Sequence, residues 1–71
     1  MATDHTKQVY YGAMVRAGRW QGRVFRYDPT GNYHRLIWES TGVGYRSEEQ
    51  ATDAALEYCE QNGYDDAIPG T

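Results

Sequence analysis

The 71-residue sequence lacks most of the features that stabilise or locate very small proteins. Cys59 is the only cysteine, so an internal disulfide is impossible, and no group of Cys and His residues has the spacing of a metal site. No apolar run approaches the roughly 20 residues of a membrane-spanning helix. No hydrophobic stretch follows residues 1–7, as it would in a secretory signal. These absences predict a soluble, cytoplasmic protein that has no metal or other cofactor and no membrane contact.

Length and composition predict one small folded domain. A chain of this size buries only about 60% of its unfolded surface, so its core must be thin. Aromatic residues make up 14% of the sequence, which argues against disorder. We expect a single domain over residues 7–63, a disordered N-terminal tail over residues 1–6 and a flexible C-terminal tail over residues 64–71.

Basic residues are absent from the last third of the chain. Residues 47–71 contain seven acids and no Lys or Arg, a net charge of −7. Residues 1–46 contain seven basic residues against three acids, a net charge of +4. Such an asymmetry between halves predicts a charged partner.

Residues 7–46 consist of short β-type runs separated by turn residues. Ala17-Gly18 supplies the first turn, and the run "DPTG" at residues 28–31 supplies the second. Because both connections are short, consecutive strands should pair antiparallel as a meander of three to four strands. With loops at residues 17–18 and 29–31, the facing pairs include Val15 with Trp20, Gly22 with Trp38 and Val24 with Leu36. One face then collects the apolar residues Val9, Tyr11, Ala13, Val15, Trp20, Val24, Leu36 and Trp38.

One helix is predicted in the acidic part of the chain. The run "SEEQ" at residues 47–50 is a capping box with Ser47 as the N-cap, and Gly63 suits the position after the last turn. Small and apolar residues recur at helical spacing, so one side of the helix can pack on the sheet. We expect Leu56 to be only partly covered, and Trp20 and Trp38 to be largely buried. The packing side consists of Ala51, Ala54, Ala55, Tyr58 and Cys59.

The predicted fold class is therefore α+β: a three- to four-stranded antiparallel meander sheet with one C-terminal α-helix packed on one face. Catalysis is not expected in this fold. Cys59 lies on the packing side, where free thiols are mostly inert. His34 is predicted to pair with Arg26 at the sheet edge, on the helix side, and no paired carboxylates face a pocket. We expect neither enzymatic activity nor a small-molecule substrate.

The other side of the sheet is the candidate functional surface. Three arginines of the run "VRAGRWQGRVFR" at residues 15–26 are predicted to point there, with aromatic residues between them and no acid. Arginines bind phosphates and guanine bases, and aromatic rings stack on bases. A polar, solvated outer face is the simpler interpretation. The predicted nucleic-acid contacts are Arg16, Arg19, Arg23, Arg35, Phe25, Tyr27 and Tyr33. The rest of this predicted face is Tyr10, Met14, Gln21 and Ile37.

Three motifs within residues 9–62 resemble a known family. They are Gly18-Arg19-Trp20, the turn at residues 28–31 and the run "GYRSEEQA" at residues 44–51. Together they look like the AP2-type fold of plant AP2/ERF DNA-binding domains and of the arm-binding domains of tyrosine recombinases. The resemblance implies that the sheet enters the major groove of DNA, with Arg16, Arg19, Arg23 and Arg35 in contact roles.

The acids of the helix support a second hypothesis. Glu49, Asp53 and Glu57 recur every four residues without a basic residue between them, so they repel one another. Such a stripe is commonly just solvated, but it can also dock a protein partner. The leading hypothesis is thus a non-enzymatic DNA-binding module. The alternative is a protein-interaction module, either a homodimer or a regulator or inhibitor of the kind found in phages and mobile elements, that uses the sheet or the helix residues Glu49, Asp53, Glu57 and Glu60.

Overall fold

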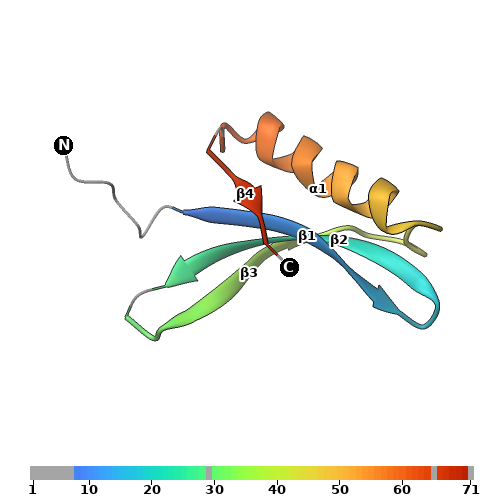
Figure 1. The fold of residues 1–71 in the computed structure, drawn as a ribbon, viewed down its shortest axis with the longest axis horizontal. Coiled ribbons are helices and arrows are strands. Elements are labelled where there is room, and N and C mark those ends of the chain that lie inside the picture. The colour runs from blue at the N-terminus through green and yellow to red at the C-terminus, as the bar shows by residue number, and fades with distance from the viewer. Residues whose placement is uncertain (1–7, 29, 65, 71) are drawn as a thin grey trace.

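The computed structural model describes residues 8–28, 30–64 and 66–70. Its elements are β1 (Val9–Arg16), β2 (Arg19–Asp28), β3 (Tyr33–Glu39), α1 (Glu48–Gln61) and β4 (Ile68–Pro69). The four strands form one sheet in the order β3-β2-β1-β4, and α1 packs against one face of it (Figure 1). Pairing is antiparallel except between β1 and β4, which are parallel. The predicted α+β class is confirmed, with a short fourth strand that makes the sheet mixed. No helix in these ranges is long and apolar enough to cross a membrane.

The hairpin of β1 and β2 has the predicted register. Val15 lies opposite Trp20, and Arg16 lies opposite Arg19, so Ala17 and Gly18 alone connect the strands. Both residues have positive φ angles, 52° and 78°, as a tight hairpin turn of this length requires. The short loop fixes the register, and the alternation of side chains along each strand then decides which residues face the helix.

The pairing of β2 with β3 differs from the prediction at two places. Asp28 pairs with Tyr33, so residues 29–32 connect the strands, one residue more than predicted. A bulge then shifts the register between Val24 and Phe25, so that Val24 lies opposite Trp38 and Ile37 is the extra residue. The predicted pairs Gly22 with Trp38 and Val24 with Leu36 are wrong for this reason.

The two shifts have different consequences along β3. Together they return Trp38 to the helix side, where it was expected. Between them, every side chain changes face, because a slip of one residue reverses the alternation. Leu36 therefore lies opposite Phe25, away from the helix, and Arg35 lies opposite Arg26, on the helix side. His34 likewise lies opposite Tyr27 and not beside Arg26, which corrects the predicted pair.

The core lies between the sheet and α1. Val9, Val24, Ala55 and Cys59 form a fully buried cluster, and larger side chains pack around it. The ring of Trp38 stacks on Tyr58 with 4.7 Å between centroids. Both tryptophans are only partly buried, so the prediction that they are largely buried is met in part. The side chains around the buried cluster are Tyr11, Ile37, Trp38, Tyr58, Tyr64 and Ala67.

The helix comes close to the sheet at Gly22. A Cβ atom at this position would lie 2.5 Å from the carbonyl oxygen of Ala51, so only glycine permits the approach. The predicted cap is present, since Ser47 Oγ accepts a hydrogen bond from the Gln50 N–H at 3.2 Å. Leu56 is partly buried, as expected.

The C-terminal segment returns to the sheet. Tyr64 and Ala67 pack against the core, and β4 lies beside β1. The Gly70 N–H donates to the Tyr11 carbonyl at 2.8 Å. A segment expected to be a flexible tail thus contains a strand, because its tertiary contacts supply what its local sequence does not. The tail predicted over residues 1–6 lies outside the described residues.

Candidate binding surface on the open face of the sheet

The face of the sheet opposite α1 is called the open face from here on. Its members follow from the register of the strand pairs. They differ from the predicted set in β3, because the longer loop and the bulge bring His34 and Leu36 to this face and move Tyr33, Arg35 and Ile37 away from it. Glu39, which the predicted set left out, also lies here, because it follows Trp38 of the helix side. The open face consists of Tyr10, Gly12, Met14, Arg16, Arg19, Gln21, Arg23, Phe25, Tyr27, His34, Leu36 and Glu39.

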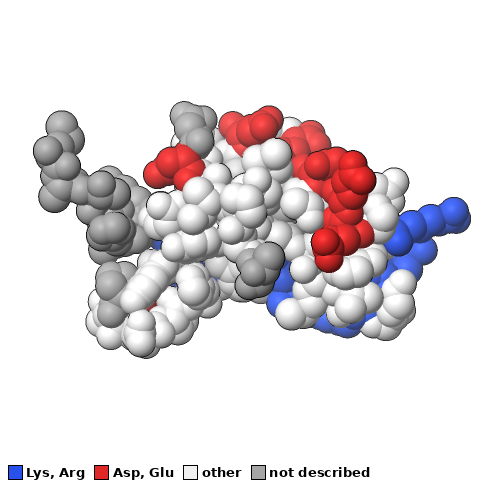
Figure 2. Space-filling view, viewed as in Figure 1, with Lys and Arg blue, Asp and Glu red and all other residues white. Residues whose placement is uncertain are grey.

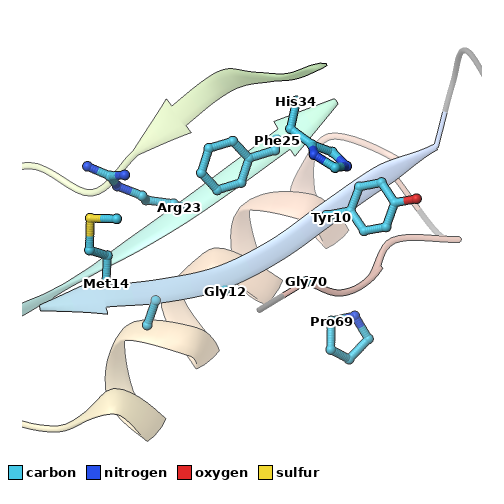
Figure 3. A pocket seen from close by; sticks show the side chains of 9 residues that line it. Tyr10, Gly12, Met14, Arg23, Phe25, His34, Pro69 and Gly70 are labelled. Atoms are coloured by element: carbon cyan, nitrogen blue, oxygen red, sulfur yellow. The ribbon is translucent and has the colours of Figure 1, made fainter. Parts of the chain in front are cut away.

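An apolar pocket of about 410 Å³ lies on the open face. Figure 3 shows Phe25 at its middle, Met14 and Arg23 toward one end, and His34 and Tyr10 toward the other. Residues from β1, β2, β3 and the C-terminal segment thus meet at one place. The lining residues are Tyr10, Gly12, Ala13, Met14, Arg23, Phe25, His34, Pro69 and Gly70.

Aromatic contacts fix the His34 end of the pocket. The imidazole ring meets the Tyr10 ring edge-on, with 5.0 Å between centroids, and the Tyr27 ring at 5.5 Å. The Tyr27 hydroxyl donates to Asn32 Oδ1 at 2.7 Å, which ties this end to the β2–β3 loop. Edge-to-face pairs of this kind hold rings in defined orientations. This wall is therefore built before any ligand arrives.

The C-terminal segment forms another wall. The carbonyl oxygen of Gly70 would lie 2.5 Å from a Cβ atom at Gly12, and Gly70 in turn lies against Tyr10. The absence of side chains at both glycines lets the segment lie flat on the edge of β1. Pro69 and Gly70 then close the pocket on that side.

The arginines of the open face are largely engaged within the domain. Arg23 Nε donates to Glu39 Oε2 at 2.6 Å, and the Arg23 side chain is only 14% exposed. Arg16 reaches the same carboxylate at 3.4 Å, with its side chain 59% exposed. The bulge in β3 places Glu39 opposite Arg23. The predicted acid-free surface is therefore wrong.

The remaining predicted arginines do not join the pocket. Arg19 donates from Nε to the Val43 carbonyl at 3.2 Å and from Nη2 to the Gly44 carbonyl at 3.3 Å, which holds the loop before α1. Arg35 lies on the helix side of β3, opposite Arg26. The guanidinium of Arg26 lies 5.7 Å from the centre of the Tyr64 ring.

The predicted aromatic contacts separate into two groups. Phe25 lines the pocket, and Tyr27 supports it through His34. Tyr33 is 51% exposed but pairs with Asp28 at the far end of the hairpin and does not line the pocket. Sequence reasoning placed Tyr10 and Met14 on the correct face without assigning them a role. Their signal was the alternation of side chains along β1.

The acidic residues of α1 form a separate surface. Glu49, Asp53, Glu57 and Glu60 are all exposed. Figure 2 shows acidic side chains along the helix and basic ones mostly at the β1–β2 hairpin end. In the described part of the chain, neither ion pair involves α1. Because α1 packs on the side of the sheet opposite the open face, these acidic residues and the pocket lie on opposite sides of the sheet.

The chemistry of the remaining side chains is limited. Burial raises the pKa of the Cys59 thiol, and the nearby charge of Glu60 raises it further, so the reactive thiolate is disfavoured. Within residues 8–28, 30–64 and 66–70, no group of three or more His, Cys, Asp or Glu side chains could hold a metal ion. The arrangement is suited to binding through shape and apolar contact.

No protein-family model, curated protein or solved structure matches this chain. The resemblance to AP2-type domains therefore stays a prediction based on short motifs.

Proposed function

We propose that this domain is a non-enzymatic protein-interaction module whose open face binds a segment of a partner protein. The observation that carries the proposal is the apolar pocket of about 410 Å³. Ligand pockets are concave, mostly apolar and roughly 300–1,000 Å³ in volume. This one has walls from several strands, so its shape belongs to the folded domain and not to a single loop.

Exposed apolar side chains extend the surface around the pocket. Met14 and Leu36 are each 45% exposed. Leu36 lies opposite Phe25 on β3, and Met14 lines the pocket from β1 at its Arg23 end. A contiguous apolar patch on a small protein favours association, because covering it removes apolar area from water. The pocket and this patch together are suited to a partner side chain and the backbone that carries it.

The arginine contacts favour a protein partner over duplex DNA at this face. Arg23 is held by Glu39 at 2.6 Å, and Arg19 is held by two loop carbonyls. Glu39 already neutralises one of the two guanidinium charges of Arg16 and Arg23. Phosphate contacts supply most of the affinity of DNA-binding proteins. The open face therefore has fewer available cations than its sequence suggests.

Selection from a random peptide library tests the proposal. The purified domain should enrich peptides that share one large apolar residue. Phe25→Gln, which replaces the middle of the pocket with a polar side chain, should lower the affinity of the enriched peptides by tenfold or more, because it removes apolar area that the peptide covers.

Tyr33→Gln is the matched control. It replaces another exposed aromatic residue of the sheet, outside the pocket, and should leave peptide affinity within about twofold. Failure to enrich any peptide, or equal losses for the two variants, would contradict the proposed function.

A second candidate function is DNA binding at the hairpin end of the sheet. Arg16 and Arg19 face each other there, and exposed Arg46 follows Tyr45, which pairs with Trp20. Most of the basic surface in Figure 2 lies at this end. For such binding, log K should fall with log salt by about 0.9 per phosphate contacted. Arg16→Gln with Arg19→Gln should reduce that slope, whereas Phe25→Gln should not.

A further inference from the structure

The pocket has room for one large side chain. Its volume of about 410 Å³ lies near the lower end of the range for ligand pockets, which is roughly 300–1,000 Å³. Phe25 and Met14 line it with apolar surface, and Tyr10 adds a ring. An aromatic or leucine side chain fits this part of the pocket, and a charged one does not, because these apolar surfaces cannot replace its hydration.

The end of the pocket near Arg23 carries an excess positive charge. Two guanidinium groups, those of Arg16 and Arg23, share the single carboxylate of Glu39. Two positive charges against one negative charge leave a net charge of +1 at this end. The geometry is also unequal, since Arg23 contacts Glu39 at 2.6 Å whereas Arg16 contacts it only at 3.4 Å.

Hydrogen-bond donors accompany the excess charge. Among the described residues, Arg23 uses only Nε for its bond to Glu39, and its two terminal nitrogens donate no hydrogen bond. Arg16 is 59% exposed, and its bonds to Glu39, at 3.4 and 3.5 Å, lie at the limit of hydrogen bonding. A second carboxylate here would accept charge-assisted hydrogen bonds from both groups.

From this arrangement we infer that the partner is an acidic protein segment. It places one large apolar side chain in the pocket and an Asp or Glu carboxylate beside it, between Arg16 and Arg23. The inference rests on the proposed function and adds the chemistry of the partner. A carboxylate matches the net charge of +1, whereas the doubly charged phosphate of a phosphorylated side chain would exceed it and be repelled more strongly by Glu39.

Three synthetic peptides test the inference by fluorescence anisotropy. The first has the sequence Ser-Asp-Asp-Trp-Asp-Asp-Ser, the second has Asn in place of each Asp, and the third has Ala in place of Trp. The acidic Trp peptide should bind the wild-type domain about fivefold or more tightly than the Asn peptide, a typical effect of one or two charge-assisted contacts. The Ala peptide should bind most weakly.

Two variants and one control test whether the preference for the Asp peptide over the Asn peptide arises beside the pocket. Arg16→Gln should remove most of the preference for Asp over Asn. Glu39→Gln should increase the preference, because it leaves both guanidinium groups without a carboxylate. Arg46→Gln removes the same charge from an exposed position outside the pocket, and it should leave the preference unchanged within about twofold.

The outcomes separate the inference from the proposed function. Equal binding of the Asp and Asn peptides, equal losses for Arg16→Gln and Arg46→Gln, or no binding of any of the three peptides would overturn the inference. Peptides enriched from the random library would still support a binding module in each case. If duplex DNA displaced the acidic peptide from the open face, and the domain bound the Trp and Ala peptides equally, both the inference and the proposed function would be overturned.

Discussion

The two faces of the sheet differ in how completely the chain covers them. On the helix side, Val9 and Val24 are fully buried, and α1 approaches Gly22 so closely that no side chain fits there. On the open face, Met14 and Leu36 remain 45% exposed around a pocket that no element fills. The first face stabilises the fold, and the second leaves apolar area that a partner can cover.

The largest expected effect belongs to the covered face. Gly22→Ala would place a methyl group 2.5 Å from the Ala51 carbonyl oxygen, so the helix must shift away from the sheet. We expect a loss of about 3 kcal/mol in the free energy of unfolding, as for other overpacked sites. Chemical denaturation followed by tryptophan fluorescence measures it. A loss below about 0.5 kcal/mol would contradict the close packing of α1 at this position.

Gly12→Ala applies the same steric change at the pocket. Its methyl group would also lie 2.5 Å from a carbonyl oxygen, that of Gly70. The neighbour here is a two-residue strand that can separate without unfolding the domain, so the loss of stability should be only about 1 kcal/mol. Amide hydrogen exchange at Gly70 should become faster, because its bond to the Tyr11 carbonyl is lost. Unchanged exchange at Gly70 would contradict the packing of the C-terminal segment.

A substitution of Ala17, in the turn between β1 and β2, should change the stability of the domain without altering either face of the sheet. Its φ angle of 52° is strained for alanine, and Asn adopts such angles more readily, especially before Gly in a hairpin turn. Ala17→Asn should therefore stabilise the domain by about 1 kcal/mol, whereas Ala17→Val should destabilise it, with thermal unfolding as the measurement. Peptide affinity should not change in either variant. A change in affinity that follows stability would mean that the open face is not a separate binding surface.

The smallest effect on stability is expected on the open face itself. Leu36→Gln changes a half-exposed residue, so the free energy of unfolding should fall by less than about 0.5 kcal/mol. The same change should weaken binding of the library-selected peptides several-fold, because Leu36 lies beside Phe25. A large loss of stability with unchanged binding would reverse the roles assigned to the two faces.

The parts predicted correctly from the sequence are those that local chemistry determines. The turn Ala17-Gly18 fixed the register of the first hairpin, and with it the facing of Tyr10, Met14 and Phe25. Ser47 and the alanines of α1 likewise determined the start and the packing side of the helix.

Features that depend on tertiary contacts were missed. The loop of four residues between β2 and β3 placed Leu36 on the side opposite to the predicted one. The bulge at Ile37, which no residue type marks, brought Glu39 opposite Arg23, so their contact was missed. The strand β4 depends on the close approach of Gly12 and Gly70, which are far apart in the sequence. The sequence therefore predicted the part of the candidate site that β1 and β2 supply, but not the part that β3 and the C-terminal segment supply.

NMR chemical-shift mapping with a library-selected peptide shows where on the domain the peptide binds. If the open face is the binding surface, amide signals of Tyr10, Met14, Phe25 and His34 should shift on titration, while those of Glu49, Asp53 and Glu57 on the outer side of α1 stay in place. Shifts confined to the acidic helix, or to the hairpin end around Arg16 and Arg19, would contradict it.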